Sequence, residues 1–156
     1  MSVSTSRWPI SRILLLEILA DRISDCFLAS LVWERLGYQP LDSSSDVWLA
    51  GQNTSLDWST AFPQAPEVIA ERKASVHLTR SIPKEYKQLL KRKLNFSGYR
   101  IGELYPRRTR RATAVNWLLA WLSSRGDELP HEGPLPRLYE PPCDPLRGHP
   151  GDLPIG

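Results

Sequence analysis

Apolar residues recur every three or four positions through much of the first 126 residues, the spacing that gathers them on one side of an α-helix. This pattern predicts helices over 9–20, 25–36, 83–94 and from 106 or 109 to 124, with a shorter one over 66–72. Ser24 is a suitable N-cap for the second helix, and Gly37 is well placed to end it. The prediction is a mainly α fold.

The last predicted helix has the clearest apolar face. Val115, Leu118, Leu119 and Leu122 follow the i, i+3, i+4, i+7 rule. Trp117 and Trp121 widen this apolar arc. We therefore expect this helix to lie at the centre of the core.

Three segments break the helical period. Residues 38–65 contain turn formers at 42–46 and two tryptophans, which indicates an ordered irregular segment with room for a short hairpin. Residues 76–79 alternate between apolar and polar and predict a brief strand. Residues 95–104 carry Gly98 and Gly102 and are expected to form a loop.

The two ends of the chain differ from its middle. Residues 1–8 are expected to be flexible. Residues 130–156 hold eight of the fourteen prolines and four of the nine glycines, a composition that favours disorder. The predicted organisation is a compact helical domain over 9–126, followed by a disordered tail over 127–156.

Composition narrows the setting of the protein. Cys26 and Cys143 are far apart and lie in unlike contexts, so we expect no disulfide and a reducing compartment. The longest uncharged run, 112–124, is too short to cross a bilayer. An apolar run at 13–16 briefly resembles a signal sequence, but Glu17 interrupts it. A cytoplasmic protein without membrane insertion is the expectation.

Charge is distributed very unevenly along the chain. Residues 72–111 contain thirteen Lys/Arg and two acids, whereas residues 1–71 contain four Lys/Arg and nine acids. Such a dense positive block favours an anionic partner, which includes nucleic acid, a phosphate-bearing ligand and an acidic protein surface.

Four arginines stand where the last helix begins: Arg107, Arg108, Arg110 and Arg111. A helix N-terminus carries partial positive charge, so cations are unfavourable there unless an anion binds beside them. We interpret the cluster as an anion-binding site. The alternative is that the arginines pair with acids of the N-terminal region and tie the domain together.

The preceding segment extends this basic region. Lys84, Lys87 and Lys91 are spaced to share one helical face, and Arg100 follows in the loop. Together with the arginines they could track a phosphate backbone, or they could simply form a solvated surface. Tyr99 and Tyr105 could stack on unpaired bases or serve as core or loop anchors.

The sequence gives little indication of a catalytic site or a metal site. The three histidines have no zinc-ligand spacing with the cysteines, and no nucleophile lies beside a convincing base. Glu17, Asp21 and Asp25 are interpreted as acids on helix surfaces. We therefore predict no enzymatic activity, no cofactor and no metal.

Three stretches resemble a known family: 31–38 (LVWERLGY), 78–85 (LTRSIPKE), and a third, the most specific, that runs from 99–103 (YRIGE) through 107–119 (RRTRRATAVNWLL). Over about residues 10–124 the chain is similar to an uncharacterised protein family of cyanobacteria, a domain of unknown function. The resemblance implies a cytoplasmic setting in a photosynthetic prokaryote and no established activity.

These observations predict a non-enzymatic regulatory or accessory protein that presents residues 84–111 to an anionic macromolecule. RNA, or the RNA-processing and translation machinery, is the first expectation. The alternative is an adaptor or inhibitor that docks on an acidic protein, such as an enzyme or a photosynthetic assembly. An enzyme acting on a phosphorylated small molecule comes third, and the sequence does not fix the oligomeric state.

Overall fold

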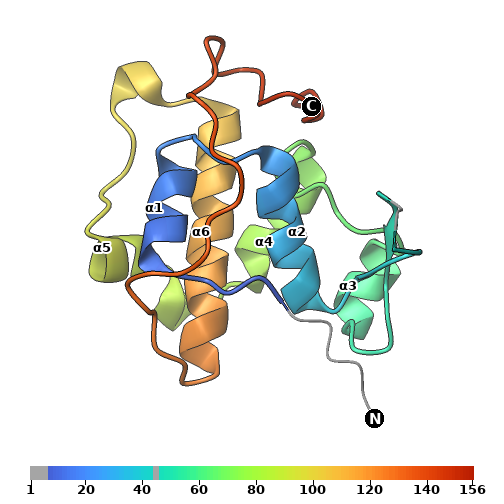
Figure 1. Cartoon of the computed structure of the whole chain (residues 1–156). Helices are drawn as coiled ribbons and strands as arrows, with labels where there is room; N and C mark the ends of the chain where they lie inside the picture. Colours follow the sequence, from blue (N-terminus) through green and yellow to red (C-terminus); the bar gives the residue numbers. More distant parts are fainter. Residues whose placement is uncertain (1–6, 44–45) are drawn as a thin grey trace.

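Helix α6 (Pro106–Ser124) runs through the middle of the molecule, and α1 (Arg12–Leu19), α2 (Asp25–Leu36), α4 (Arg72–Ser81) and α5 (Leu89–Leu94) pack around it (Figure 1). The computed structural model describes residues 7–43 and 46–156. Its remaining helices are α3 (Leu56–Ala61) and the short 3-10 helices η1 (Lys84–Tyr86) and η2 (Ile101–Glu103). The predicted mainly α fold is confirmed.

The core is built around the middle of α6, as its apolar face predicts. Ala114, Val115 and Leu118 are fully buried there, and Leu119 is nearly so. They belong to one continuous cluster with buried residues of α1, α2, α4 and α5. Helix α6 therefore holds the other elements in place through apolar burial.

The predicted ends of α2 are confirmed. The Ser24 hydroxyl accepts a hydrogen bond from the Phe27 N–H, and Gly37 adopts the left-handed conformation with a φ of 93°. A Cβ atom at position 37 would lie 2.8 Å from the backbone of Asn53. Glycine is thus required both by the backbone conformation and by the close approach of the next loop.

The irregular segment contains the short hairpin that its turn formers allowed. Strands β1 (Gln39–Pro40) and β2 (Trp48–Leu49) pair antiparallel, with Gln39 opposite Leu49. Trp48 packs against Trp33 with ring centroids 5.5 Å apart, which fixes the hairpin to α2. Helix α3 was not predicted, because Trp58 is its one buried residue and leaves no apolar period to detect.

Two local predictions in the middle of the chain are wrong. Residues 76–79 lie within α4 rather than in a strand, because Leu78 and Ala74 form a helical pair on the buried side. Four residues of alternation are too few to exclude a helix. The predicted helix over 66–72 is absent as well: residues 68–70 form a turn, and α4 begins at Arg72.

The segment over 83–94 is divided rather than continuous. A turn at Lys87 and Gln88 separates η1 from α5. The three lysines at 84, 87 and 91 therefore do not share one helical face.

The C-terminal tail is ordered against the domain, in contrast to the disorder predicted from its composition (Figure 1). The Arg12 N–H donates to the Pro130 carbonyl, the Tyr139 N–H to the Arg22 carbonyl, and the Gly156 N–H to the Ala70 carbonyl, at 2.7–2.8 Å. Leu129, Leu135, Leu138 and Ile155 pack against the core. A proline-rich chain without regular structure can be held by such separate anchors.

Only the last two residues of the segment predicted to be flexible, 1–8, can be compared with the structure. Residues 1–6 lie outside the described residues. Trp8 is anchored: its ring meets Phe27 edge to face at 5.1 Å, and its indole N–H donates to the Pro134 carbonyl. At residues 7 and 8 the predicted flexibility is therefore not what the structure shows.

Candidate functional site: an internal ionic cluster and an exposed basic face

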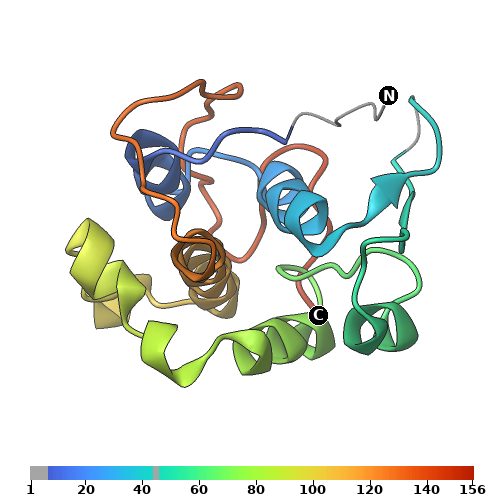
Figure 2. The same cartoon turned by 90° about the horizontal axis from the view of Figure 1, so that it is seen from below.

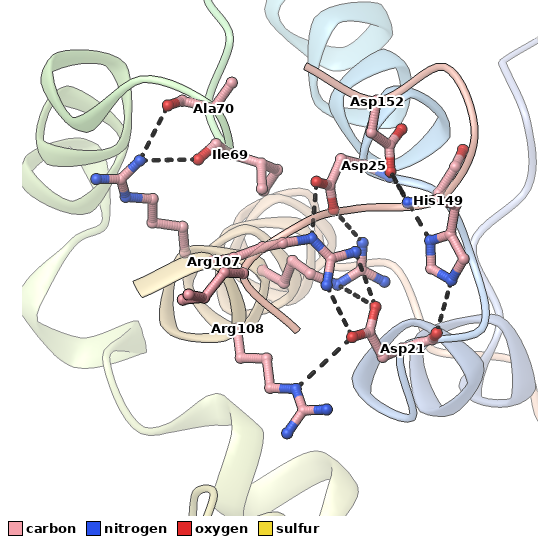
Figure 3. Close-up of polar contacts among 12 residues, drawn as sticks. Asp21, Asp25, Ile69, Ala70, Arg107, Arg108, His149 and Asp152 are labelled. Atoms are coloured by element: carbon pink, nitrogen blue, oxygen red, sulfur yellow. Dashed lines mark hydrogen bonds and ion pairs between the residues drawn. The ribbon is translucent and has the colours of Figure 1, made fainter. Parts of the chain in front are cut away.

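Arg107, in the first turn of α6, is fully buried between α1 and α2 (Figure 3). Its two terminal nitrogens donate to the two carboxylate oxygens of Asp21, at 2.7 and 2.9 Å. Its Nε donates to Asp25 at 2.9 Å. One guanidinium thus joins two carboxylates in the fork geometry that arginine favours.

Arg111 lies one turn further along the same face of α6 and is also fully buried. It donates to Asp25 at 2.6 Å and to the carbonyl oxygens of Ile18 and Ile23. These carbonyls belong to the end of α1 and to the link that follows it. The i, i+4 spacing of the two arginines lets them hold α1 and α2 together.

The two acids are positioned by the link between α1 and α2. Asp21 adopts a positive φ of 61°, which is unusual for a residue other than glycine, and Asp25 is the first residue of α2. Aspartate tolerates this left-handed conformation better than most residues. The bend turns both carboxylates toward α6.

Burial makes the cluster interdependent. Desolvation on its own would lower the pKa of Arg107, but its hydrogen bonds and charge contacts with Asp21 and Asp25 prevail and raise that pKa. A buried ion pair gains little over an apolar pair, yet removing one partner leaves an unpaired buried charge. The four side chains must therefore be present as a set.

This arrangement corrects two sequence-based interpretations. Arg107 and Arg111 are not part of an exposed anion site, because carboxylates of the N-terminal region already satisfy the positive end of α6. The alternative of internal pairing is the one that the structure adopts. Asp21 and Asp25, which were interpreted as surface acids, are buried at 2% and 6% exposure.

The other two arginines of the run also have internal partners. The Arg108 guanidinium donates to the Glu103 carbonyl and lies 3.6 Å from Asp21. Arg110 donates to the carbonyl oxygens of Ile69, Ala70 and Gly156, and burial lowers its pKa, with Arg72 contributing further. Both side chains thus serve mainly to join segments of the fold.

The tail adds a second layer to the cluster. The Asp152 carboxylate, fully buried, accepts hydrogen bonds from the backbone N–H groups of Asp25 and Cys26 at 2.9 and 3.0 Å. The His149 ring donates through Nε2 to the Asp21 carbonyl at 2.9 Å (Figure 3). The tail thereby caps α2 and braces the bend that carries Asp21. Sequence analysis assigned no role to either residue, since a proline-rich tail gives no periodic signal.

The two tyrosines considered for base stacking act differently. Tyr99 is largely buried: its hydroxyl donates to the Leu19 carbonyl, and its ring meets Phe96 at 5.1 Å. Tyr105 precedes α6, and the Arg108 guanidinium lies 5.4 Å from its ring centre. Tyr99 is therefore a loop anchor, as the alternative interpretation held.

The remaining cations form what we call the basic face: the exposed Lys and Arg side chains of α4, η1, α5 and the turn between η1 and α5. These elements follow one another along one side of the molecule (Figure 2). They are Arg72, Lys73, Arg80, Lys84, Lys87, Lys91, Arg92 and Lys93. Within residues 7–43 and 46–156, none of the eight lies within 4 Å of a carboxylate. Arg100 is equally exposed but lies in the loop that leads from α5 to α6.

A cavity of about 410 Å³ opens beside this face, between α5, α6 and the loop over 95–104. Lys87 and Lys91 lie at its edge, and its apolar lining includes Leu90, Phe96 and Leu104. Ile101, in the same loop, is 95% exposed. The basic face is thus bordered by apolar surface.

Neither a cluster of metal ligands nor a membrane-spanning helix is present in the described residues. Across 7–43 and 46–156, no group of three or more His, Cys, Asp or Glu side chains is arranged to hold a metal ion. The same part of the chain contains no helix of the length and apolarity needed to span a membrane.

Fold and site together define a class: a small helical domain held by a buried arginine–aspartate cluster, with a separate surface whose cations have no carboxylate partner in the described residues. Residues 9–123 match the domain of unknown function DUF1823, and the chain belongs to this family. The chain is also similar to a protein whose solution NMR structure is known, with 46% identity and a TM-score of 0.65. That match covers 81% of this chain and 100% of the other. No curated protein shows a significant match.

Proposed function

We propose that this protein is a non-enzymatic regulatory or accessory factor that binds an anionic macromolecule, RNA in the first place, through its basic face. The observation that carries the proposal is that the eight exposed cations of the basic face have no carboxylate partner within the described residues. The buried arginines of α6 are neutralised internally, so the attraction for a polyanion arises from the basic face.

The arrangement supports contact with a phosphate backbone more than base recognition. Lysine and arginine side chains can follow a phosphate chain by charge alone, and displaced counterions then make the affinity fall steeply with salt. Of the two candidates for stacking, Tyr99 is occupied within the fold, and the Arg108 guanidinium lies over the Tyr105 ring. Binding should therefore depend on ionic strength and only weakly on base sequence.

A second candidate partner is an acidic protein surface, which one observation favours. The cavity beside Lys87 and Lys91 has apolar walls, and Leu104 and Ile101 are exposed near it. Protein interfaces combine an apolar centre with a charged rim, whereas a phosphate backbone makes no apolar contacts with such a centre. Capture of a protein that survives nuclease treatment would favour this partner over RNA.

The test compares two charge-matched double variants by fluorescence anisotropy with labelled single-stranded and duplex RNA. Lys84→Gln/Lys91→Gln removes two cations of the basic face, and Arg137→Gln/Arg147→Gln removes two exposed cations of the tail. We expect the first variant to bind more weakly and its log–log salt slope to shrink by about 0.7 to 0.9 per lost phosphate contact. The tail variant should bind as the wild type does. Equal binding by all three proteins, or no salt dependence, would contradict the proposal.

A further inference from the structure

A small polar cavity of about 190 Å³ lies beside the C-terminal ends of α2 and α6, and no residue of the basic face lines it. Three arginines contribute to its walls: Arg7, Arg35 and Arg125. Gln39 and Asn53, with amide donors in their side chains, line it as well. The cavity therefore gathers hydrogen-bond donors from four separate segments of the chain.

The three guanidinium groups converge on one aromatic ring. Their carbon atoms lie 5.3, 5.2 and 4.4 Å from the ring centre of Trp121, for Arg7, Arg35 and Arg125 in that order. Contact with the ring compensates in part for the mutual repulsion of the cations. Arg35 already donates to the carbonyl oxygens of Trp8 and Leu31. Arg7 and Arg125 are therefore the two cations that can turn to a ligand.

The cavity carries an excess of positive charge. Burial, with smaller contributions from Arg7 and Arg125, lowers the pKa of Arg35 to about 10 against the opposing effect of Glu34. Glu34 is the single acid among the lining residues, 3.5 Å from Arg35. Three cations and one carboxylate leave a local charge of about two positive units.

One further carboxylate touches this group from outside. Asp127, which does not line the cavity, lies 3.3 Å from the Arg125 Nε, and both side chains are half exposed. Such exposed pairs contribute little free energy, so Arg125 can exchange Asp127 for another anion at small cost.

We propose that this cavity binds a small phosphate monoester. The dianionic phosphate matches the local charge, and the guanidinium forks of Arg7 and Arg125 suit its oxygens. The amides of Gln39 and Asn53 supply further donors, so the cavity offers hydrogen bonds on several sides. The cavity volume restricts the ligand to one phosphate with a few additional atoms, so this site is distinct from the surface proposed for a macromolecule.

The test is a titration with inorganic phosphate and with glycerol 3-phosphate, followed by two-dimensional ¹H–¹⁵N NMR of the whole chain at constant ionic strength with chloride as the balancing ion. We expect saturable shifts of the Trp121 indole N–H, of the Gly37 amide and of the Gln39 and Asn53 side-chain amides. Arg7→Gln and Arg125→Gln should each weaken binding about tenfold or more, since each removes a charge-assisted hydrogen bond. Arg147→Gln, an exposed arginine elsewhere, should not change it.

Two results would overturn the proposal. The first is that the NMR shifts do not saturate with phosphate, or that both arginine variants give the same shifts as the wild type. Either outcome would mean that the cations act only within the fold. The second is equal binding of malonate, a dicarboxylate of similar charge, which would remove the assignment to phosphate. The Lys84→Gln/Lys91→Gln variant should retain the site, which separates this result from the outcome of RNA binding.

Discussion

Arg107 and Asp21, 86 residues apart in the sequence, face each other with two parallel hydrogen bonds in the interior of the domain. The pair connects the beginning of the last helix to the bend between the first two. It turns the least favourable feature of α6, cations at its positive end, into a link between three helices.

Removing either member of this pair should destabilise the fold strongly. We expect Arg107→Gln or Asp21→Asn to lower the free energy of unfolding by about 3–5 kcal/mol, because the remaining charge stays buried and unpaired. Urea denaturation measures the change. The control is Arg108→Gln, whose guanidinium lies 3.6 Å from Asp21 and is less buried, and which should cost much less. Equal, small effects in all three variants would argue against a structural role for the pair.

The tail should contribute measurable stability through Asp152. Asp152→Ala removes the carboxylate that accepts from two N–H groups at the start of α2, and we expect a loss of about 0.5–2 kcal/mol, the range for an N-terminal cap. Thermal unfolding followed by circular dichroism is a suitable measurement. Asp144→Ala, in an exposed turn of the same tail, serves as the control. An unchanged midpoint in the first variant would mean that the tail is not docked in solution.

The centre of the core can be tested at Leu118. Truncation of this fully buried side chain to alanine should cost about 2–5 kcal/mol, since it removes apolar contacts and leaves a cavity. Leu153→Ala, at a side chain that is 48% exposed, should have little effect. Similar midpoints for both variants in urea would remove α6 from the core.

Stability should depend on pH through Glu67. Burial, together with the nearby charges of Glu71, Asp152 and Asp25, raises the pKa of Glu67 from 4.5 to about 7. Because the folded state holds this proton more tightly than the unfolded state, Glu67 contributes stability below about pH 4.5, and this contribution is lost as the pH rises through 7.

Comparison with Glu67→Gln isolates this effect. As the pH rises from 4.5 to 7, the wild type should lose the stability that the protonated Glu67 contributes, while the variant keeps its own. The free energy of unfolding of the variant, relative to that of the wild type, should therefore rise over this range. A difference that stays constant over this range would show that folding does not raise the pKa of Glu67.

The sequence by itself determined the elements whose signals are local. The ends of α2 follow from Ser24 and Gly37, which act through neighbouring backbone groups, and the central position of α6 follows from its own apolar period. The family resemblance over about 10–124 is likewise confirmed by the match over 9–123, while its cyanobacterial origin stays a prediction. The basic character of 72–111 was also evident from composition, although its partner was not.

Only the tertiary structure decided which charges are free. Arg107 and Lys84 look alike in the sequence, but one is buried against Asp21 and the other is exposed without a carboxylate partner in the described chain. The same holds for Asp152, which reaches the start of α2 from 127 residues away. Pairing of this kind depends on distances in space between segments far apart in the chain, and neither composition nor periodicity encodes those distances.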